Sequence, residues 1–199
     1  PSAGVSVRES KAAEQLAEHG VEARVDLDPV FFLDRERWCE LAARKVRKEP
    51  YVLVYVIAQN YEGMVRQARE IADMRRARLY VLSVRPIRTP GVDRNFLFAN
   101  PSDFLALFRD ADFVVSNSFH GTAFSIIFRK RFLTYTAKYN ARIENILALT
   151  GLERRLVTDR FDEASVTEGI DYSAPADAIV RGTMGARAYL QDLIEEAAR

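Results

Sequence analysis

The sequence predicts an α/β fold, a Rossmann-like parallel sheet with helices on both faces. Apolar runs rich in β-branched and aromatic residues occur at 51–58, 78–84 and 113–116. Such continuous apolar runs are typical of strands that are covered on both faces. Segments with helical apolar spacing separate them, and this strand–helix rhythm indicates parallel strands with helices packed on the two sides of the sheet.

Composition and charge narrow the class of protein. The 199 residues are 48% hydrophobic and 29% charged, which is enough to build a full core without disulfides. The 29 basic and 28 acidic residues are interspersed, and this disfavours a nucleic-acid-binding domain because such domains concentrate basic charge. With Cys39 as the single cysteine, no bilayer-length apolar run and no signal peptide, we expect a cytoplasmic protein without a transmembrane segment.

The stretch before residue 35 contains only short elements. They are strands at 5–7 and 21–25, a helix at 10–20 that ends at Gly20, and an extended segment at 30–33. These elements are too few to enclose a core. Residues 1–34 are therefore predicted to be the remnant of a preceding α/β domain and a linker, and residues 35–199 a Rossmann-like C-terminal domain.

Within the predicted C-terminal domain, strands and helices alternate. A helix capped by Asp34 is expected at 35–48, and residues 86–100 are expected to form a long loop with a short strand at 96–98. The chain is expected to end in one long helix or two at 175–198. The remaining predictions are strands at 51–58, 78–84, 113–116 and 132–136, and helices at 61–76, 101–109, 121–128 and 142–150.

Small polar residues gather where the strand at 113–116 ends and the next helix begins. They are Ser116, Asn117, Ser118, Gly121 and Thr122. Ligands of parallel sheets bind outside the carboxyl ends of strands, and a helix N-terminus offers free N–H groups to phosphate or carboxylate. His120 lies in the same turn and can donate a proton near neutral pH. The pattern favours an anion site, and the alternative is a surface histidine beside ordinary capping residues.

Two arginines are further candidates. Arg142 follows Asn140 at the start of a helix, where the helix dipole disfavours a cation, so it can serve an anion at the same sheet edge. Its alternative role is a surface ion pair with Glu144 or Glu153. Arg8 lies between a short strand and a helix, where an exposed position is the alternative.

No metal site is expected, because the two histidines and the single cysteine lie far apart in the sequence and do not form a closed ligand set.

Four ordered segments carry a resemblance to a known family. The run ADFVVSNSFHGTAFSIIFRKRF, followed by NARIENIL and GLERRLV, resembles the polysaccharide pyruvyl transferase family. The opening VSVRESKAAEQLAEHGVEARVDLDPVFFLDRERW is similar to the middle region of that family. The resemblance covers residues 5–160, and the order of the segments makes it more specific than the histidine turn alone.

The resemblance implies a chemistry and a set of roles. Family members transfer the enolpyruvyl unit of phosphoenolpyruvate onto a sugar of a cell-surface polysaccharide or exopolysaccharide as a ketal, without a cofactor. His120 matches the active-site histidine, and Arg8 matches an arginine after the short strand. Many relatives have arginine-leucine-histidine where this chain has Ser118-Phe119-His120, so Arg142 is expected to supply the missing charge. Backbone N–H groups of residues 120–122 would complete the anion cradle.

The resemblance also implies a fold like the C-terminal half of a glycosyltransferase-B-type enzyme. Family members begin with a strand, a glycine-aspartate turn and further βα units, so we expect this chain to be a fragment whose N-terminal domain is missing. Two alternatives remain open at this point. One is a nucleotide-sugar glycosyltransferase of the same fold type, and the other is a non-catalytic sugar- or anion-binding module.

Overall fold

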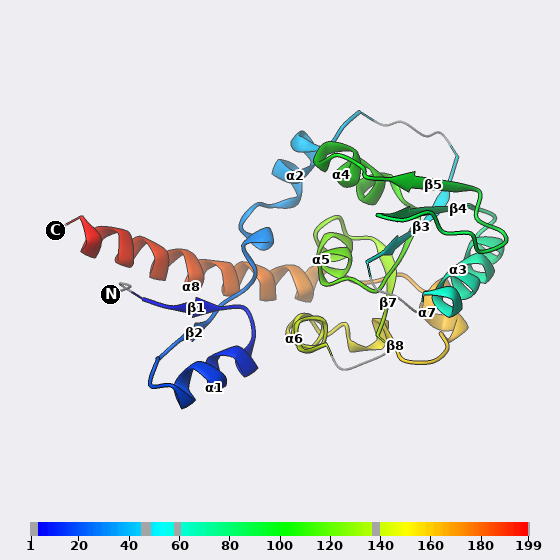
Figure 1. Cartoon of the computed structure of the whole chain (residues 1–199). Helices are drawn as coiled ribbons and strands as arrows, with labels where there is room; N and C mark the ends of the chain where they lie inside the picture. Colours follow the sequence, from blue (N-terminus) through cyan, green and yellow to red (C-terminus); the bar gives the residue numbers. More distant parts are fainter. Residues whose placement is uncertain (1–3, 45–48, 58–60, 137–139, 199) are drawn as a thin grey trace.

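The computed structural model describes residues 4–44, 49–57, 61–136 and 140–198, and a parallel sheet forms its centre (Figure 1). The sheet has six strands in the order β5-β4-β3-β6-β7-β8, and each neighbouring pair is parallel. This confirms the predicted fold class. The strands are β3 (Tyr51–Val56), β4 (Arg78–Ser83), β5 (Arg94–Leu97), β6 (Phe113–Ser116), β7 (Arg131–Tyr135) and β8 (Leu156–Val157).

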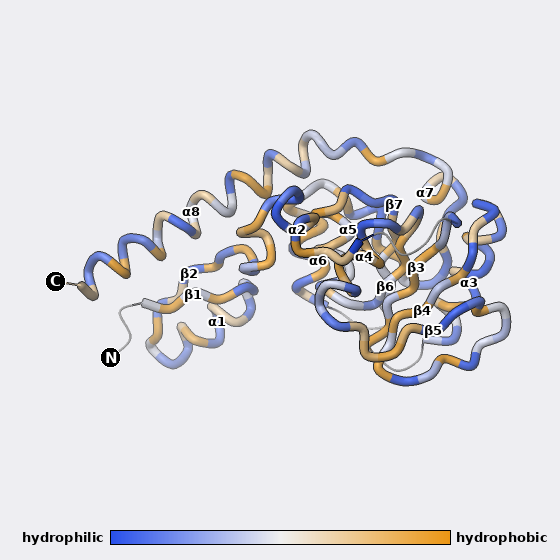
Figure 2. Tube along the Cα trace, turned by 90° about the horizontal axis from the view of Figure 1, so that it is seen from above, coloured by the Kyte–Doolittle hydropathy of each residue, from blue (hydrophilic) through white to orange (hydrophobic). Residues whose placement is uncertain are grey.

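Side-chain alternation along the strands divides the core into two layers. On β3, Leu53 packs into a cluster with α4, α5 and α6, whereas Val52 and Val54 pack into a cluster with α3 and α7. In Figure 2 the central strands are coloured mainly as hydrophobic residues, as expected for strands buried on both faces. The covering helices are α3 (Glu62–Met74), α4 (Pro101–Asp110), α5 (Phe119–Ile127), α6 (Ala141–Thr150) and α7 (Glu163–Thr167).

The first part of the chain forms a small unit beside the main sheet. Strand β1 (Ser6–Val7) pairs in parallel with β2 (Arg24–Val25), and α1 (Ser10–Glu18) connects them. The 3-10 helix η1 (Pro29–Phe32) and α2 (Arg35–Leu41) then lead towards β3. We call the segment from β1 to β2 the N-terminal unit.

The last helix returns to this N-terminal unit. Helix α8 (Ser173–Ala197) runs from the main sheet back along β1 and β2, so both ends of the chain lie on the same side of the molecule (Figure 1). Gly182 permits this close approach, because a Cβ atom there would lie 2.6 Å from Leu27 Cδ1. The boundary predicted at residue 34 stays a prediction, and α8 contacts residues on both sides of it.

The structure corrects three expected elements. Residues 30–32 are not extended, because the Asp28 carboxylate caps the 3-10 helix η1, and only Leu33 has an extended backbone. The helix expected at 35–48 ends at Leu41, since Ala43 leaves it to donate its N–H to the carbonyl of Ser102 at 2.9 Å. Residues 45–48 lie outside the described residues. The strand expected at 96–98 begins earlier, at Arg94.

Two short elements had no counterpart in the sequence prediction. Strand β8 has two residues and α7 has five, which is too short for either periodicity to be recognised. The 3-10 helix η2 (Glu153–Arg155) precedes β8. Across the described residues, no helix combines the length and the apolar character that a membrane crossing requires.

Candidate functional site

The candidate site lies at the carboxyl edge of the sheet, between β3 and β6. From β3 the chain adds β4 and β5 on one side, and from β6 it adds β7 and β8 on the other. The crevice at such a reversal of strand order is the general ligand site of open α/β sheets. Asn117 follows β6, and its Oδ1 accepts the Ile57 N–H at 3.1 Å, which ties the two strand ends together.

The turn after β6 is held by buried hydroxyl groups. Ser116 Oγ donates to the Tyr55 carbonyl at 3.1 Å and accepts the Ser118 N–H at 3.0 Å. Gly121 packs directly on this hydroxyl, because a Cβ atom there would lie 2.7 Å from Ser116 Cβ and closer still to its Oγ. Glycine is therefore required for α5 to sit against β6. Burial also raises the pKa of the Tyr55 phenol beside this turn, which keeps it neutral.

Thr122 is part of the same internal network. Its Oγ1 donates to the Ser118 carbonyl at 3.1 Å and lies 2.7 Å from Thr134 Oγ1 on β7. Its backbone N–H also donates to the Ser118 carbonyl, so the expected anion cradle loses this donor. The side chains of Ser116, Ser118 and Thr122 are buried and shape the turn, and their contact with a ligand stays a prediction.

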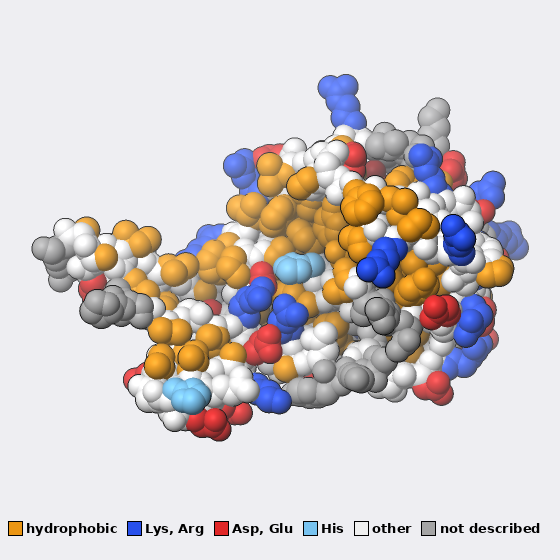
Figure 3. Space-filling view, in the orientation of Figure 1, with side chains coloured by type: hydrophobic (Ala, Val, Ile, Leu, Met, Phe, Trp, Pro, Cys, Tyr) orange, Lys and Arg blue, Asp and Glu red, His pale blue; other side chains and the backbone are white. Residues whose placement is uncertain are grey.

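His120 projects from the first turn of α5 with about half of its side chain exposed. Its Nε2 lies 4.0 Å from Asp28 Oδ2. In Figure 3, basic and acidic side chains gather in the middle of the visible face, below an apolar area. The predicted histidine thus meets a carboxylate from the segment that joins the N-terminal unit to the main sheet.

Asp28 is a buried acid that the sequence interpretation did not include in the site. Its side chain is 6% exposed, and its Oδ2 accepts a hydrogen bond from Arg8 Nη1 at 2.5 Å. Its Oδ1 accepts the Val30 N–H at 3.0 Å and so starts η1. The only sequence signal was the Asp-Pro pair, which is typical of a capped turn.

Arg142 reaches the site from the start of α6. Asn140 Oδ1 accepts the Ile143 N–H at 3.4 Å and thereby caps this helix. The Arg142 Nε lies 3.3 Å from Glu9 Oε1, and its guanidinium carbon lies 5.4 Å from the centre of the Phe119 ring. The alternative partner Glu144 instead accepts the Asn140 N–H at 3.3 Å.

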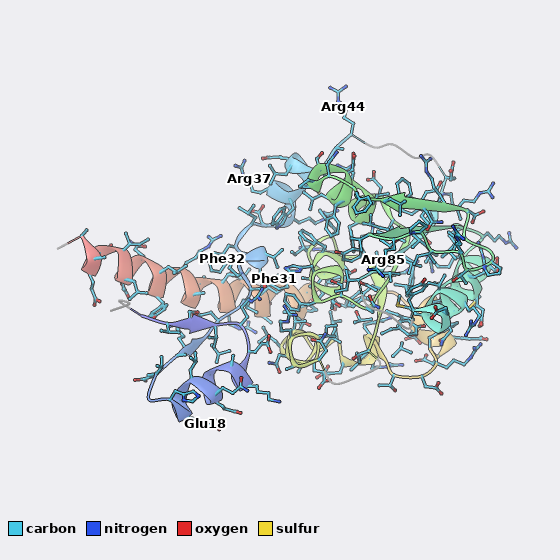
Figure 4. The ribbon with its side chains drawn as sticks, in the orientation of Figure 1. Glu18, Phe31, Phe32, Arg37, Arg44 and Arg85 are labelled. Carbon is cyan, nitrogen blue, oxygen red and sulfur yellow. The ribbon has the colours of Figure 1, made fainter. Side chains whose placement is uncertain are left out.

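A cavity of about 510 Å³ lies between the N-terminal unit, α6 and α8. Arg8, Asp28, Phe119 and Arg142 are among its lining residues. Phe31 and Phe32, on η1, stand between α5 and α8 beside it (Figure 4). The fold therefore brings the predicted Arg8, His120 and Arg142 to one place, although they lie far apart in the sequence. Among the residues that the structure describes, no cluster of three or more potential metal ligands occurs.

The parallel sheet, its two layers of helices and the switch-point turn define a Rossmann-like fold that resembles one half of the glycosyltransferase-B arrangement. A UDP-GlcNAc 2-epimerase from Methanocaldococcus jannaschii, solved with UDP-GlcNAc and UDP, aligns with a TM-score of 0.54 and 13% identity, over 90% of this chain and 60% of that chain. A protein described as a UDP-N-acetylglucosamine 2-epimerase from Listeria monocytogenes aligns with a TM-score of 0.52 and 14% identity, over 95% of this chain and 59% of that chain. The chain thus spans about three fifths of these proteins, and the likeness is one of fold.

The family is shown by sequence. The family model for polysaccharide pyruvyl transferase matches residues 2–139, which is more than half of the chain. The chain belongs to the polysaccharide pyruvyl transferase family. No curated protein matches it.

Proposed function

We propose that this chain carries the donor-binding part of an enzyme that moves the enolpyruvyl unit of phosphoenolpyruvate onto a saccharide as a ketal. The main observation in support is that Arg8 and His120 lie next to one buried carboxylate, Asp28, within the segment that the family model covers. The guanidinium groups of Arg8 and Arg142 line the cavity, and the His120 imidazole lies next to Asp28, which also lines it. These groups suit a small substrate with a carboxylate and a phosphate.

The reaction sets the requirements for the site. The methylene carbon of phosphoenolpyruvate gains a proton and becomes a methyl group, and positive charge develops on the neighbouring carbon. One sugar hydroxyl adds to that carbon, phosphate leaves, and a second hydroxyl closes the ketal. The hydroxyls release two protons, of which one balances the proton given to the methyl group and the other leaves with phosphate.

Each candidate residue has a place in this scheme. His120 is the proton donor to the methylene carbon, since about half of its side chain is exposed and histidine is the residue type that most often serves as a general acid. Arg8 and Arg142 bind the carboxylate and phosphate of the donor through their planar guanidinium groups. Both are engaged with acids in the structure, so the donor would exchange with Asp28 and Glu9 for part of their hydrogen bonds.

We further propose that the complete enzyme has an N-terminal α/β domain, which precedes this chain. The complete enzyme would act in the cytoplasm on precursors of a cell-surface polysaccharide or exopolysaccharide. The support is that the chain spans only about three fifths of its structural neighbours. The upstream coding sequence tests this directly, because it should encode a strand, a glycine-aspartate turn and further βα units.

Calorimetry on the 199-residue chain tests the donor. We expect phosphoenolpyruvate to bind more tightly than inorganic phosphate, and Arg8→Ala to weaken it by at least about tenfold, as for a lost charged hydrogen bond. Arg37→Ala is the matched control, because Arg37 lies on α2, pairs with Glu40 and projects away from the sheet (Figure 4). Binding of UDP- or GDP-sugars with no binding of phosphoenolpyruvate would instead favour the nucleotide-sugar transferase.

A further inference from the structure

We propose that Asp28 positions His120 by facing its Nε2, so that Nδ1 is the nitrogen that carries the reacting proton. The contact joins the segment after β2 to the first turn of α5, which are distant in the sequence. The catalytic meaning of this contact rests on the proposed role of His120 as proton donor. The contact itself can be measured without turnover.

The Asp28 carboxylate has a fixed orientation. Its Oδ1 accepts the Val30 N–H at 3.0 Å, and its Oδ2 accepts from Arg8 Nη1 at 2.5 Å. The side chain is 6% exposed, and the neighbouring Phe31 is buried in the main core. Rotation of the carboxylate would break both hydrogen bonds, so they hold Oδ2 directed towards His120.

The distance from Oδ2 to His120 Nε2 is 4.0 Å, longer than a hydrogen bond. Contacts between catalytic groups are often long without substrate and shorten when it binds. The imidazole is half exposed and can turn towards the carboxylate, whereas the carboxylate is held. A carboxylate facing one ring nitrogen keeps a proton on that nitrogen, and this leaves the opposite nitrogen to exchange protons with the substrate.

The proton balance follows from this arrangement. When the imidazolium gives the Nδ1 proton to the methylene carbon of the donor, the neutral ring that remains has its proton on Nε2, facing Asp28. The ring needs no rotation between the two states. Asp28 is therefore a positioning residue.

Asp26 offers a matched comparison within the same segment. Its side chain is 9% exposed and also binds an arginine, with Arg24 Nε at 2.7 Å from Oδ1. Its Oδ2 accepts a hydrogen bond from Ser6 at 2.7 Å. The two acids thus share burial and an arginine partner, and they differ in that Asp28 faces His120.

The test is nitrogen-15 NMR of the histidine imidazoles in the 199-residue chain at a pH where they are neutral. The chain has two histidines, so a His19→Gln variant assigns the signals of His120. In the wild type we expect the proton of neutral His120 on Nε2. A wild-type ring with its proton mainly on Nδ1 would overturn the proposal, and this result needs no variant of Asp28.

Asp28→Asn provides the second arm. The carboxylate accepts from the Val30 N–H at one oxygen and from Arg8 Nη1 at the other, whereas the amide of the variant has only one oxygen. We expect a larger fraction of the neutral ring to carry its proton on Nδ1, because the amide replaces a charged acceptor beside Nε2 by a neutral oxygen or by a donor. Asp26→Asn should leave the ring unchanged. An unchanged ring in the Asp28 variant, with its fold intact by circular dichroism, would contradict the proposal.

Turnover separates this proposal from the proposed function. In the enzyme form that turns over phosphoenolpyruvate, Asp28→Asn should lower kcat by about 100-fold, the scale of a lost acid–base group. Asp28→Asn with an unchanged kcat would reject Asp28 as a positioning residue and leave the pyruvyl transfer standing. If the wild type bound no phosphoenolpyruvate, the proposed pyruvyl transfer would be rejected. The NMR result would still show whether Asp28 sets the position of the proton on His120.

Discussion

Arg142 and Glu9 come from different units of the molecule and form an ion pair, with Nε and Oε1 3.3 Å apart. Arg142 opens α6 on the main sheet, and Glu9 is the residue before α1 in the N-terminal unit. About one third of each side chain is exposed. The pair therefore links the two units and at the same time partly neutralises an arginine proposed to bind the donor.

We predict that Glu9→Gln tightens the binding of phosphoenolpyruvate to the chain by about two- to fivefold. The removed carboxylate competes with the donor for Arg142, and partly exposed ion pairs contribute up to about 1 kcal/mol. Calorimetry measures the dissociation constant. Glu18→Gln, at the far end of α1, is the control and should leave it unchanged (Figure 4). Weaker binding in the Glu9 variant would contradict a competing role.

His120→Ala should lower turnover of phosphoenolpyruvate by at least about 100-fold in the complete enzyme, because the variant loses its proposed proton donor. Phosphate release in the presence of the saccharide acceptor is the measurement. His19→Ala serves as the control, since His19 ends α1 in the N-terminal unit. Wild-type-like turnover in the His120 variant would reject its catalytic role.

Gly121→Ala should destabilise the chain by about 1–3 kcal/mol, the usual range for overpacking. The new Cβ would collide with the Ser116 hydroxyl beneath α5. Gly63→Ala is the opposite case, because its Cβ meets nothing within 4 Å at the start of α3, and it should be neutral or stabilising. Urea denaturation measures the free energy of unfolding of both variants, and a Gly121→Ala variant as stable as the wild type would contradict this close packing.

Alkaline pH should destabilise the fold through buried phenols. Burial raises the pKa of Tyr172 far above its ordinary value of 10.0, and its hydroxyl donates to the Lys130 carbonyl at 2.5 Å. Above about pH 10 the unfolded chain loses this proton while the folded chain keeps it, so the free energy of unfolding falls as pH rises. Urea denaturation between about pH 9 and about pH 11 should show this slope.

Tyr172→Phe isolates the contribution of this phenol. Partial burial lowers the pKa of Lys130, which acts in the opposite direction, since the unfolded chain then holds more protons below the ordinary lysine pKa. Lys130 is present in both the wild type and the Tyr172→Phe variant, so the difference between their pH dependences of the free energy of unfolding reports the contribution of Tyr172. The variant should be less stable at neutral pH by about 1 kcal/mol, for the lost hydrogen bond, and less sensitive to alkali. If the free energy of unfolding of Tyr172→Phe fell as steeply with rising pH as that of the wild type, the loss of stability in alkali would not come from Tyr172.

The sequence by itself determined the class of fold and most of its elements. Continuous apolar runs at β3, β4 and β6 required burial on both faces, and only a sheet covered by two helix layers provides it. The alternation with helical segments then required parallel strands. The sequence also pointed to the histidine turn and the two arginines as candidates, because residue type and position at a strand end or helix start are local properties.

Only the tertiary structure decided which of these residues meet. Helix α2 ends at Leu41 because Ala43 bonds to Ser102, and Asp28 joins the site because η1 brings it to His120. Arg142 pairs with Glu9 and not with the neighbouring Glu144. Periodicity and capping depend on residues within a few positions of each other, whereas these contacts depend on how separate elements pack.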